Sequence, residues 1–210
     1  MRTLSAYVLL AIISCVGAAS SQEIVLGLSK QEIGITAFFD GSEILIFGAL
    51  KHQNEASSEG ELDVVITIAS PRIPVVVRRK EKRLGIWMNV DALEVDLAPN
   101  FYAVATSGPF DQVVSKESDL WHQISVQQMI GAASGPEKLE NPEEFTEAVV
   151  RIRENEGLYQ TLTGAVTLQN QTLFSASVTL PANLVEGSYT ARIFLMSDGD
   201  VIAQHQTAID

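Results

Sequence analysis

The stretch from Leu173 to Ile209 reads LFSASVTLPANLVEGSYTARIFLMSDGDVIAQHQTAI and decides the fold class. Apolar residues alternate with polar ones through Phe174–Leu180 and again through Tyr189–Leu195, which is the period of a strand with one buried face. Asp198-Gly199 separates two such patterns and predicts a two-residue hairpin turn, followed by a last strand over Val201–Ile209. The C-terminal part of the chain is therefore predicted to be antiparallel sheet.

Short strand patterns also fill the N-terminal half. The continuous apolar run Ile44–Leu50 predicts a strand that is covered on both faces. Further strands are expected around Ile24–Leu28, Ile33–Ala37, Leu62–Ile68, Val75–Val77, Leu84–Met88, Leu93–Leu97 and Phe101–Ala105.

A single domain over residues 20–210 is expected, because residues 165–210 are too few to bury a core alone. We predict a mainly β, immunoglobulin-like antiparallel β-sandwich with a helical excursion; two small sandwiches are the alternative. Leu180-Pro181 followed by Gly187-Ser188-Tyr189 is typical of the corner where a tyrosine bonds back to the backbone.

The helical excursion is expected at about residues 116–158. Asn141-Pro142-Glu143-Glu144 has the residues of a helix start, and Gly157 those of a helix end. Between them Phe145, Val149 and Ile152 recur at helical spacing, and Glu147 and Arg151 can pair one turn apart. A weaker helix is expected over Glu117–Ile130, with Leu120, Ile124 and Gln128 on one face, and a loop over Gly131–Leu139.

The N-terminus is typical of a secretory signal. Arg2 precedes a short apolar run, and small residues follow, with Gly17 and Ala19 placed for cleavage before Ser20. Residues 1–19 are therefore predicted to direct export to the periplasm. Lipidation of Cys15, which would anchor the chain as a lipoprotein, is the alternative to simple cleavage.

The composition restricts the chemistry of the exported part. The formal net charge of −12 disfavours nucleic acid as a partner, because phosphate binding needs a basic surface. Cys15 is the single cysteine and the three histidines lie far apart in the sequence, so neither a metal site nor a thiol nucleophile is expected. No catalytic motif and no cofactor motif is present, and we expect a protein without a cofactor that is not an enzyme.

One basic cluster stands out from this acidic chain. It comprises Arg78, Arg79, Lys80, Lys82 and Arg83, and Trp87 follows shortly after it. One interpretation is a hairpin with a solvated basic tip and Trp87 in a second core face. The other is a binding surface, where arginines contact small anions, acidic surfaces or anionic lipid headgroups beside a tryptophan.

The chain resembles the alphaproteobacterial putative transmembrane protein family. Val77-Arg78-Arg79-Lys80, Gly85-Ile86-Trp87-Met88-Asn89 and Phe101–Ser107 carry the resemblance, and Glu156-Gly157-Leu158-Tyr159, Leu180-Pro181 and Gly187-Ser188-Tyr189-Thr190 match its later part. Members usually end in a C-terminal membrane helix, and this chain shows no apolar run of that length after the signal. The resemblance implies inner-membrane association and, as a partner, a membrane protein such as a sulfite-exporter-like transporter.

These observations lead to one functional expectation and one alternative. The chain is expected to be a non-enzymatic accessory or interaction module at the periplasmic face of the inner membrane, with the basic cluster and Trp87 as its contact surface. The alternative is a periplasmic binding protein for a small anion such as sulfite or sulfate. The sequence leaves the oligomeric state open.

Overall fold

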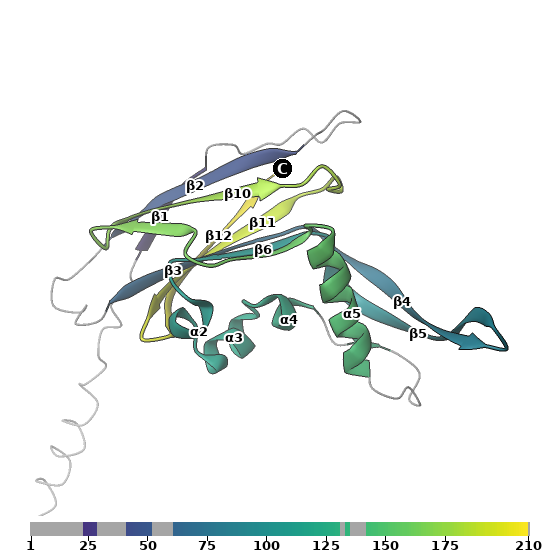
Figure 1. Ribbon diagram of the computed structural model, residues 1–210. Coiled ribbons are helices and arrows are strands. Elements are labelled where there is room, and N and C mark those ends of the chain that lie inside the picture. Colours follow the sequence, from purple (N-terminus) through teal and green to yellow (C-terminus); the bar gives the residue numbers. More distant parts are fainter. Residues whose placement is uncertain (1–22, 29–40, 52–60, 131–132, 135–141, 210) are drawn as a thin grey trace, which may run out of the picture.

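The computed structural model describes residues 23–28, 41–51, 61–130, 133–134 and 142–209. Strands dominate these ranges, which confirms the mainly β prediction. Two sheets lie one above the other, short helices lie beneath the lower sheet, and a long hairpin projects to one side (Figure 1). Within the described ranges, no helix is both long enough and apolar enough to span a bilayer.

Each sheet of the sandwich combines strands from both halves of the chain. The four-stranded sheet has the order β1 (Glu23–Leu28), β2 (Ser42–Lys51), β10 (Leu173–Leu180) and β9 (Val166–Gln169). The five-stranded sheet has the order β12 (Asp200–Ile209), β11 (Tyr189–Ser197), β3 (Leu62–Ala69), β6 (Tyr102–Thr106) and β8 (Tyr159–Leu162). All neighbours are antiparallel except β6 and β8, which are parallel because the helical segment crosses over between them.

The helical segment consists of α2 (Phe110–Val113), α3 (Lys116–His122), α4 (Val126–Met129) and α5 (Pro142–Asn155). The prediction of one helix over Glu117–Ile130 is wrong. Gln123 adopts a positive φ of 51° and ends α3, after which Ser125 caps α4 by accepting from the Gln128 N–H. Because of this break, Leu120 is exposed and Ile124 is buried, so they do not share a face.

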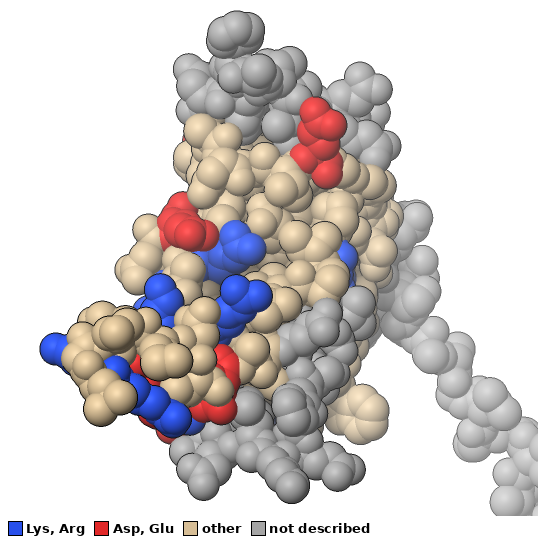
Figure 2. Space-filling view, turned by 90° about the vertical axis from the view of Figure 1, so that its right-hand side faces the viewer, with Lys and Arg blue, Asp and Glu red and all other residues tan. Residues whose placement is uncertain are grey.

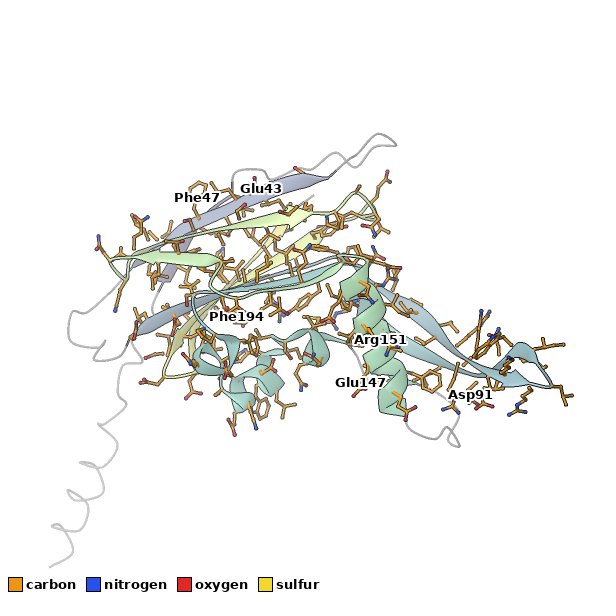
Figure 3. All side chains as sticks on the ribbon, viewed as in Figure 1. Glu43, Phe47, Asp91, Glu147, Arg151 and Phe194 are labelled. Atoms are coloured by element: carbon orange, nitrogen blue, oxygen red, sulfur yellow. The ribbon has the colours of Figure 1, made fainter. Side chains whose placement is uncertain are left out.

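The five-stranded sheet is the middle layer of the molecule. In β11, Ile193 and Leu195 are buried on one face, and Phe194 is buried on the other, where its ring meets His122 of α3. Figure 3 shows Phe194 between this sheet and the helices. By contrast, Phe47 of β2 lies on the outer side of the four-stranded sheet and is 45% exposed, so the expectation that β2 is covered on both faces is wrong.

Arg192 links the end of α3 to the middle sheet. Arg192 of β11 donates to the carbonyls of His122 and Gln123 at 2.8 and 2.9 Å, at the end of α3. It also donates to the hydroxyls of Thr67 and Tyr102 at 3.2 and 3.1 Å. These four acceptors occupy most of the guanidinium donors, so Arg192 has a structural role.

Several details of the C-terminal part follow the sequence predictions. Phe174, Ala176, Val178 and Leu180 are all buried, as their alternation predicts. The Tyr189 hydroxyl donates to the Val185 carbonyl at 2.7 Å, which is the bond expected for a tyrosine corner. The immunoglobulin-like assignment itself stays a prediction. The strand expected at Ile33–Ala37 and the predicted cap at Asn141 lie outside the described residues.

The third sheet is built on the projecting hairpin, which consists of β4 (Arg72–Arg83) and β5 (Ile86–Pro99), with the short β7 (Ala133–Ser134) at its base. The two strands expected at Leu84–Met88 and Leu93–Leu97 are one continuous strand, β5. Its pairing with β7 is confined to Glu94 and Val95. We call the part beyond this pairing, residues 78–91, the arm.

Helix α5 supports the base of the arm. Phe145 and Val149 are buried beneath it, as their spacing predicts, whereas Ile152 is about half exposed. At its end Gly157 has a φ of 71°, and Leu158 donates to the Arg153 carbonyl at 2.8 Å, so the predicted glycine stop is confirmed. The proposed Glu147–Arg151 ion pair does not form in the described structure, although both side chains lie on α5 (Figure 3).

Candidate functional site: the tip of the arm

The arm ends in a two-residue turn at Leu84-Gly85, whose φ angles are 52° and 85°. Positive φ at both central residues is the geometry of a type I′ turn, which suits the twist of a hairpin. The predicted hairpin with exposed cations near its end is therefore present, but the cations themselves do not form the turn. Arg78 to Arg83 instead form the last part of β4, and the turn follows them.

Four apolar side chains surround this turn, and all are exposed. We call them the apolar tip: Leu84, Ile86, Trp87 and Met88. Leu84 is fully exposed, Ile86 is 67% exposed and Trp87 is 66% exposed. The interpretation that Trp87 lies in a second core face is therefore wrong, because the arm extends beyond the body and has no core beneath it there (Figure 1).

Cations and apolar groups face each other across the two strands. Lys82 lies opposite Trp87, and Arg83 lies opposite Ile86. Directly opposed residues share a face of the ribbon. Each face of the arm end thus carries a cation from β4 beside an apolar side chain from β5. The blue side chains of Lys and Arg gather along the projecting arm at the lower left of Figure 2.

The predicted cations have different surroundings. Arg78, Lys80 and Lys82 are exposed, and Arg83 is exposed with its guanidinium 3.3 Å from Glu81 of the same strand. Arg79 differs, because it is half-buried and paired with Asp91 across the hairpin. Its guanidinium also lies 5.7 Å from the centre of the Phe145 ring and 3.9 Å from Glu144. Arg79 therefore joins the arm to α5, and its charge is already paired with Asp91.

A groove of about 430 Å³ runs between the arm base and α5. Its lining includes Arg78, Arg79 and Arg151, but Glu144 and Glu147 line it too. Glutamates repel an anion that the arginines would attract. A second hollow of about 340 Å³ is lined by Arg72 and Arg192, and Arg192 is already bound by the four acceptors described above. The arginines of the first hollow are thus accompanied by two carboxylates, and Arg192 of the second already has four acceptors.

Among the predicted site residues, the structure brings Lys80, Lys82, Arg83 and Trp87 together towards the end of the arm. It places Arg78 and Arg79 at the base of the arm, beside the groove with α5. The sequence analysis missed Leu84, Ile86 and Met88 as surface groups, because their alternation is also that of a core-facing strand. The signal that could have identified them is Gly85 next to five cations, since a glycine between two strand patterns marks a hairpin turn and so charged a segment is rarely buried.

Comparison with known proteins gives one match. Residues 23–210 match the family described as "Putative transmembrane protein (Alph_Pro_TM)". No curated protein matches the chain. No solved structure matches it either.

Proposed function

We propose that this chain, which belongs to the Alph_Pro_TM family, is a non-enzymatic accessory module that works at the periplasmic face of the inner membrane. The apolar tip and the exposed cations of the arm are its contact surface. The family description is consistent with work at a membrane, and the export signal predicted at residues 1–19 provides the compartment.

The observation that carries this proposal is the exposure of the apolar tip. Large apolar side chains are usually buried, and a group of them at one place on a surface is typical of a contact site for another molecule. Here four such side chains occupy the end of an unsupported two-stranded ribbon, where they stabilise nothing within the described structure. Their role therefore lies in a contact with another molecule.

Charge supports the same surface. The arm carries five cations against two carboxylates, Glu81 and Asp91, on a chain whose formal net charge is −12. A positive site on an acidic protein selects acidic partners and orients the encounter with them. The small-anion alternative has less support, because Arg79 is paired with Asp91 and the adjoining groove contains two glutamates.

Site-specific photo-crosslinking in the native host tests the proposal. We expect a photoreactive residue in place of Ile86 to crosslink to components of the inner membrane. Ile202 of β12 is the matched control, since it is also an exposed isoleucine on a strand but lies outside the arm. Equal crosslinking from both positions, or none from position 86, would refute the arm as the contact surface.

A further inference from the structure

We infer that the arm contacts lipid directly: the apolar tip inserts into the headgroup region of an anionic bilayer while the exposed cations of β4 bind the lipid phosphates. This inference rests on the proposed function and names its partner. It follows from the order of side chains along the arm, the backbone at its turn, and the distribution of charge.

The apolar side chains at the end of the arm extend over a length that fits the depth of a membrane interface. Leu84 lies at the end of the arm, and Ile86, Trp87 and Met88 occupy the next three residues of β5. At about 3.3 Å per residue, these positions span roughly 10 Å, which is the depth that interfacial elements reach. Lysine and arginine side chains at the same depth extend their charged ends back to the lipid phosphates. Tryptophan is enriched in the interfacial layer between headgroups and hydrocarbon.

The backbone limits insertion to this shallow depth. The arm is a two-stranded ribbon, and among the described residues no third strand pairs with residues 78–91. Its outer edges therefore carry backbone N–H and C=O groups without strand partners. Such groups need water and do not enter the hydrocarbon layer. The headgroup layer still contains water, so a ribbon that stops there keeps its edges solvated.

The turn residue adds independent support. Leu84 has a φ of 52°, a value that residues other than glycine, asparagine and aspartate adopt at a cost. A large apolar side chain at this position gains nothing from folding, because Leu84 is fully exposed. Backbone strain and exposed apolar surface at one residue are features of a functional contact.

Charge disfavours a contact between the arms of two copies of the chain. Two arms placed together would oppose Lys80, Lys82 and Arg83 with the same cations. An anionic bilayer attracts these cations and repels the acidic body, which therefore stays away from the lipid surface. The five residue steps from Arg79 to Leu84 extend about 16 Å, or roughly two Debye lengths at physiological salt, so the carboxylates of the body are largely screened from the surface.

The chain contains its own control for an experiment. It has two tryptophans, Trp87 of the arm and Trp121 of α3, and Trp121 is 83% exposed. The neighbours of Trp121 on α3 include the acidic Glu117 and Asp119, which anionic lipid repels. Both side chains are exposed, so replacing either one leaves the core unchanged. If exposure alone determined membrane insertion, both tryptophans would insert. Our inference predicts that only Trp87 inserts.

We therefore expect different fluorescence from two variants of the whole chain, Trp121→Phe and Trp87→Phe, mixed with vesicles of phosphatidylglycerol and phosphatidylcholine. Trp87 emission should shift to shorter wavelength and become protected from acrylamide, whereas Trp121 emission should not change. Pure phosphatidylcholine vesicles, inorganic phosphate and sulfate should have little effect. Replacing Lys82 by serine should weaken vesicle binding about fivefold, and high salt should weaken it further.

Three results would overturn the inference: no change of Trp87 emission with anionic vesicles, an equal change of Trp121, or a full response to free phosphate. The crosslinking from position 86 then separates the two proposals. If crosslinks to a membrane protein persist without vesicle binding, the contact surface stands and its partner is a protein. If both signals are absent, the proposed function fails as well.

Discussion

Two hairpins of this protein have the same turn and opposite surroundings. Leu84-Gly85 at the end of the arm has φ angles of 52° and 85°, and Asp198-Gly199 between β11 and β12 has 52° and 86°. The second turn packs on the body, where the Gly199 carbonyl accepts from the Ser115 N–H at 2.9 Å. Among the described residues the first turn has no such contact, since a Cβ atom added to Gly85 would have no neighbour within 4 Å.

The difference lies in the residue before each glycine. Aspartate is among the residues that tolerate this backbone, so Asp198 agrees with its turn. Leucine does not, and Leu84 has no packing that offsets the strain. Local consistency between residue and backbone is the rule in folded proteins, and violations gather at functional sites. Of these two turns, the one at the end of the arm is therefore the one whose sequence disagrees with its backbone, as we expect if Leu84 serves the proposed contact.

The largest expected effect is a difference in the free energy of unfolding between a substitution in the core and one on the arm. Phe194→Ala in β11 should lower the free energy of unfolding by about 3–5 kcal/mol, because it leaves a cavity between the middle sheet and α3. Trp87→Ala on the arm should change it by less than about 0.5 kcal/mol, because that side chain is exposed. Urea denaturation measures both. A loss near 2 kcal/mol for Trp87→Ala would mean that the tip packs within the protein.

Alkaline pH should destabilise the body through its buried tyrosines. Burial raises the pKa of Tyr159 in β8 from 10.0 to about 12, and its hydroxyl donates to the Pro99 carbonyl at 2.8 Å. The unfolded chain therefore loses this proton first. The contribution of the buried Tyr159 hydroxyl to the free energy of unfolding is fully present below pH 10. It falls by about 2–3 kcal/mol as the pH rises towards 12.

The control for the alkaline effect is Tyr159→Phe. This variant should be less stable by about 1 kcal/mol at neutral pH, since the hydrogen bond is lost, but its stability should fall less between pH 10 and 12. Residues 78–91 contain no tyrosine, so the arm adds nothing to the effect. An equal decline in both proteins would contradict the assignment to Tyr159.

The two turn glycines offer a matched pair of smaller effects. Ala at either position adopts an unfavourable φ, which costs about 1 kcal/mol. At Gly199 the new Cβ would also lie 3.2 Å from Ser115 Cβ, at the cap of α3, so Gly199→Ala should cost about 2 kcal/mol. Gly85→Ala should cost no more than about 1 kcal/mol. Denaturant midpoints compare the two, and equal losses would show that the surroundings do not matter.

The smallest expected effect is a gain. Leu84→Asn should stabilise the hairpin by about 0.5 kcal/mol, since asparagine tolerates the positive φ. Asp198→Leu, the converse change, should cost about 1 kcal/mol. Hydrogen exchange of amides near each turn reports the local stability. If Leu84→Asn weakened the hairpin, Leu84 would have a structural role and the contrast between the turns would disappear.

Local patterns predicted much of the fold. Alternation located β10 and β11, Asp198-Gly199 located the hairpin, and Gly157 located the end of α5, because each depends on neighbours in sequence. What could not be predicted depends on tertiary context. Phe194 is buried only because α3 covers that face, and Leu45 is exposed although it belongs to an apolar run.

The candidate site was predicted in part for the same reason. The concentration of cations at residues 78–83 is visible in the sequence, and so is Trp87 next to it. Whether Ile86 and Met88 face a core or solvent depends on how far the hairpin extends beyond α5. The local sequence pattern does not indicate that length. The pairing of Arg79 with Asp91 depends likewise on the register of β4 and β5.

The strand order has a consequence for how the chain is made. β2 pairs with β10, and β3 pairs with β11, so the central pairs of both sheets join residues that lie far apart in the sequence. During synthesis, neither sheet can close until the C-terminal strands have left the ribosome. Such non-local pairing makes folding slow. This architecture delays folding until the strands up to β11 are available. A chain that folds late suits the transport of unfolded polypeptide across a membrane that the signal predicted at residues 1–19 implies.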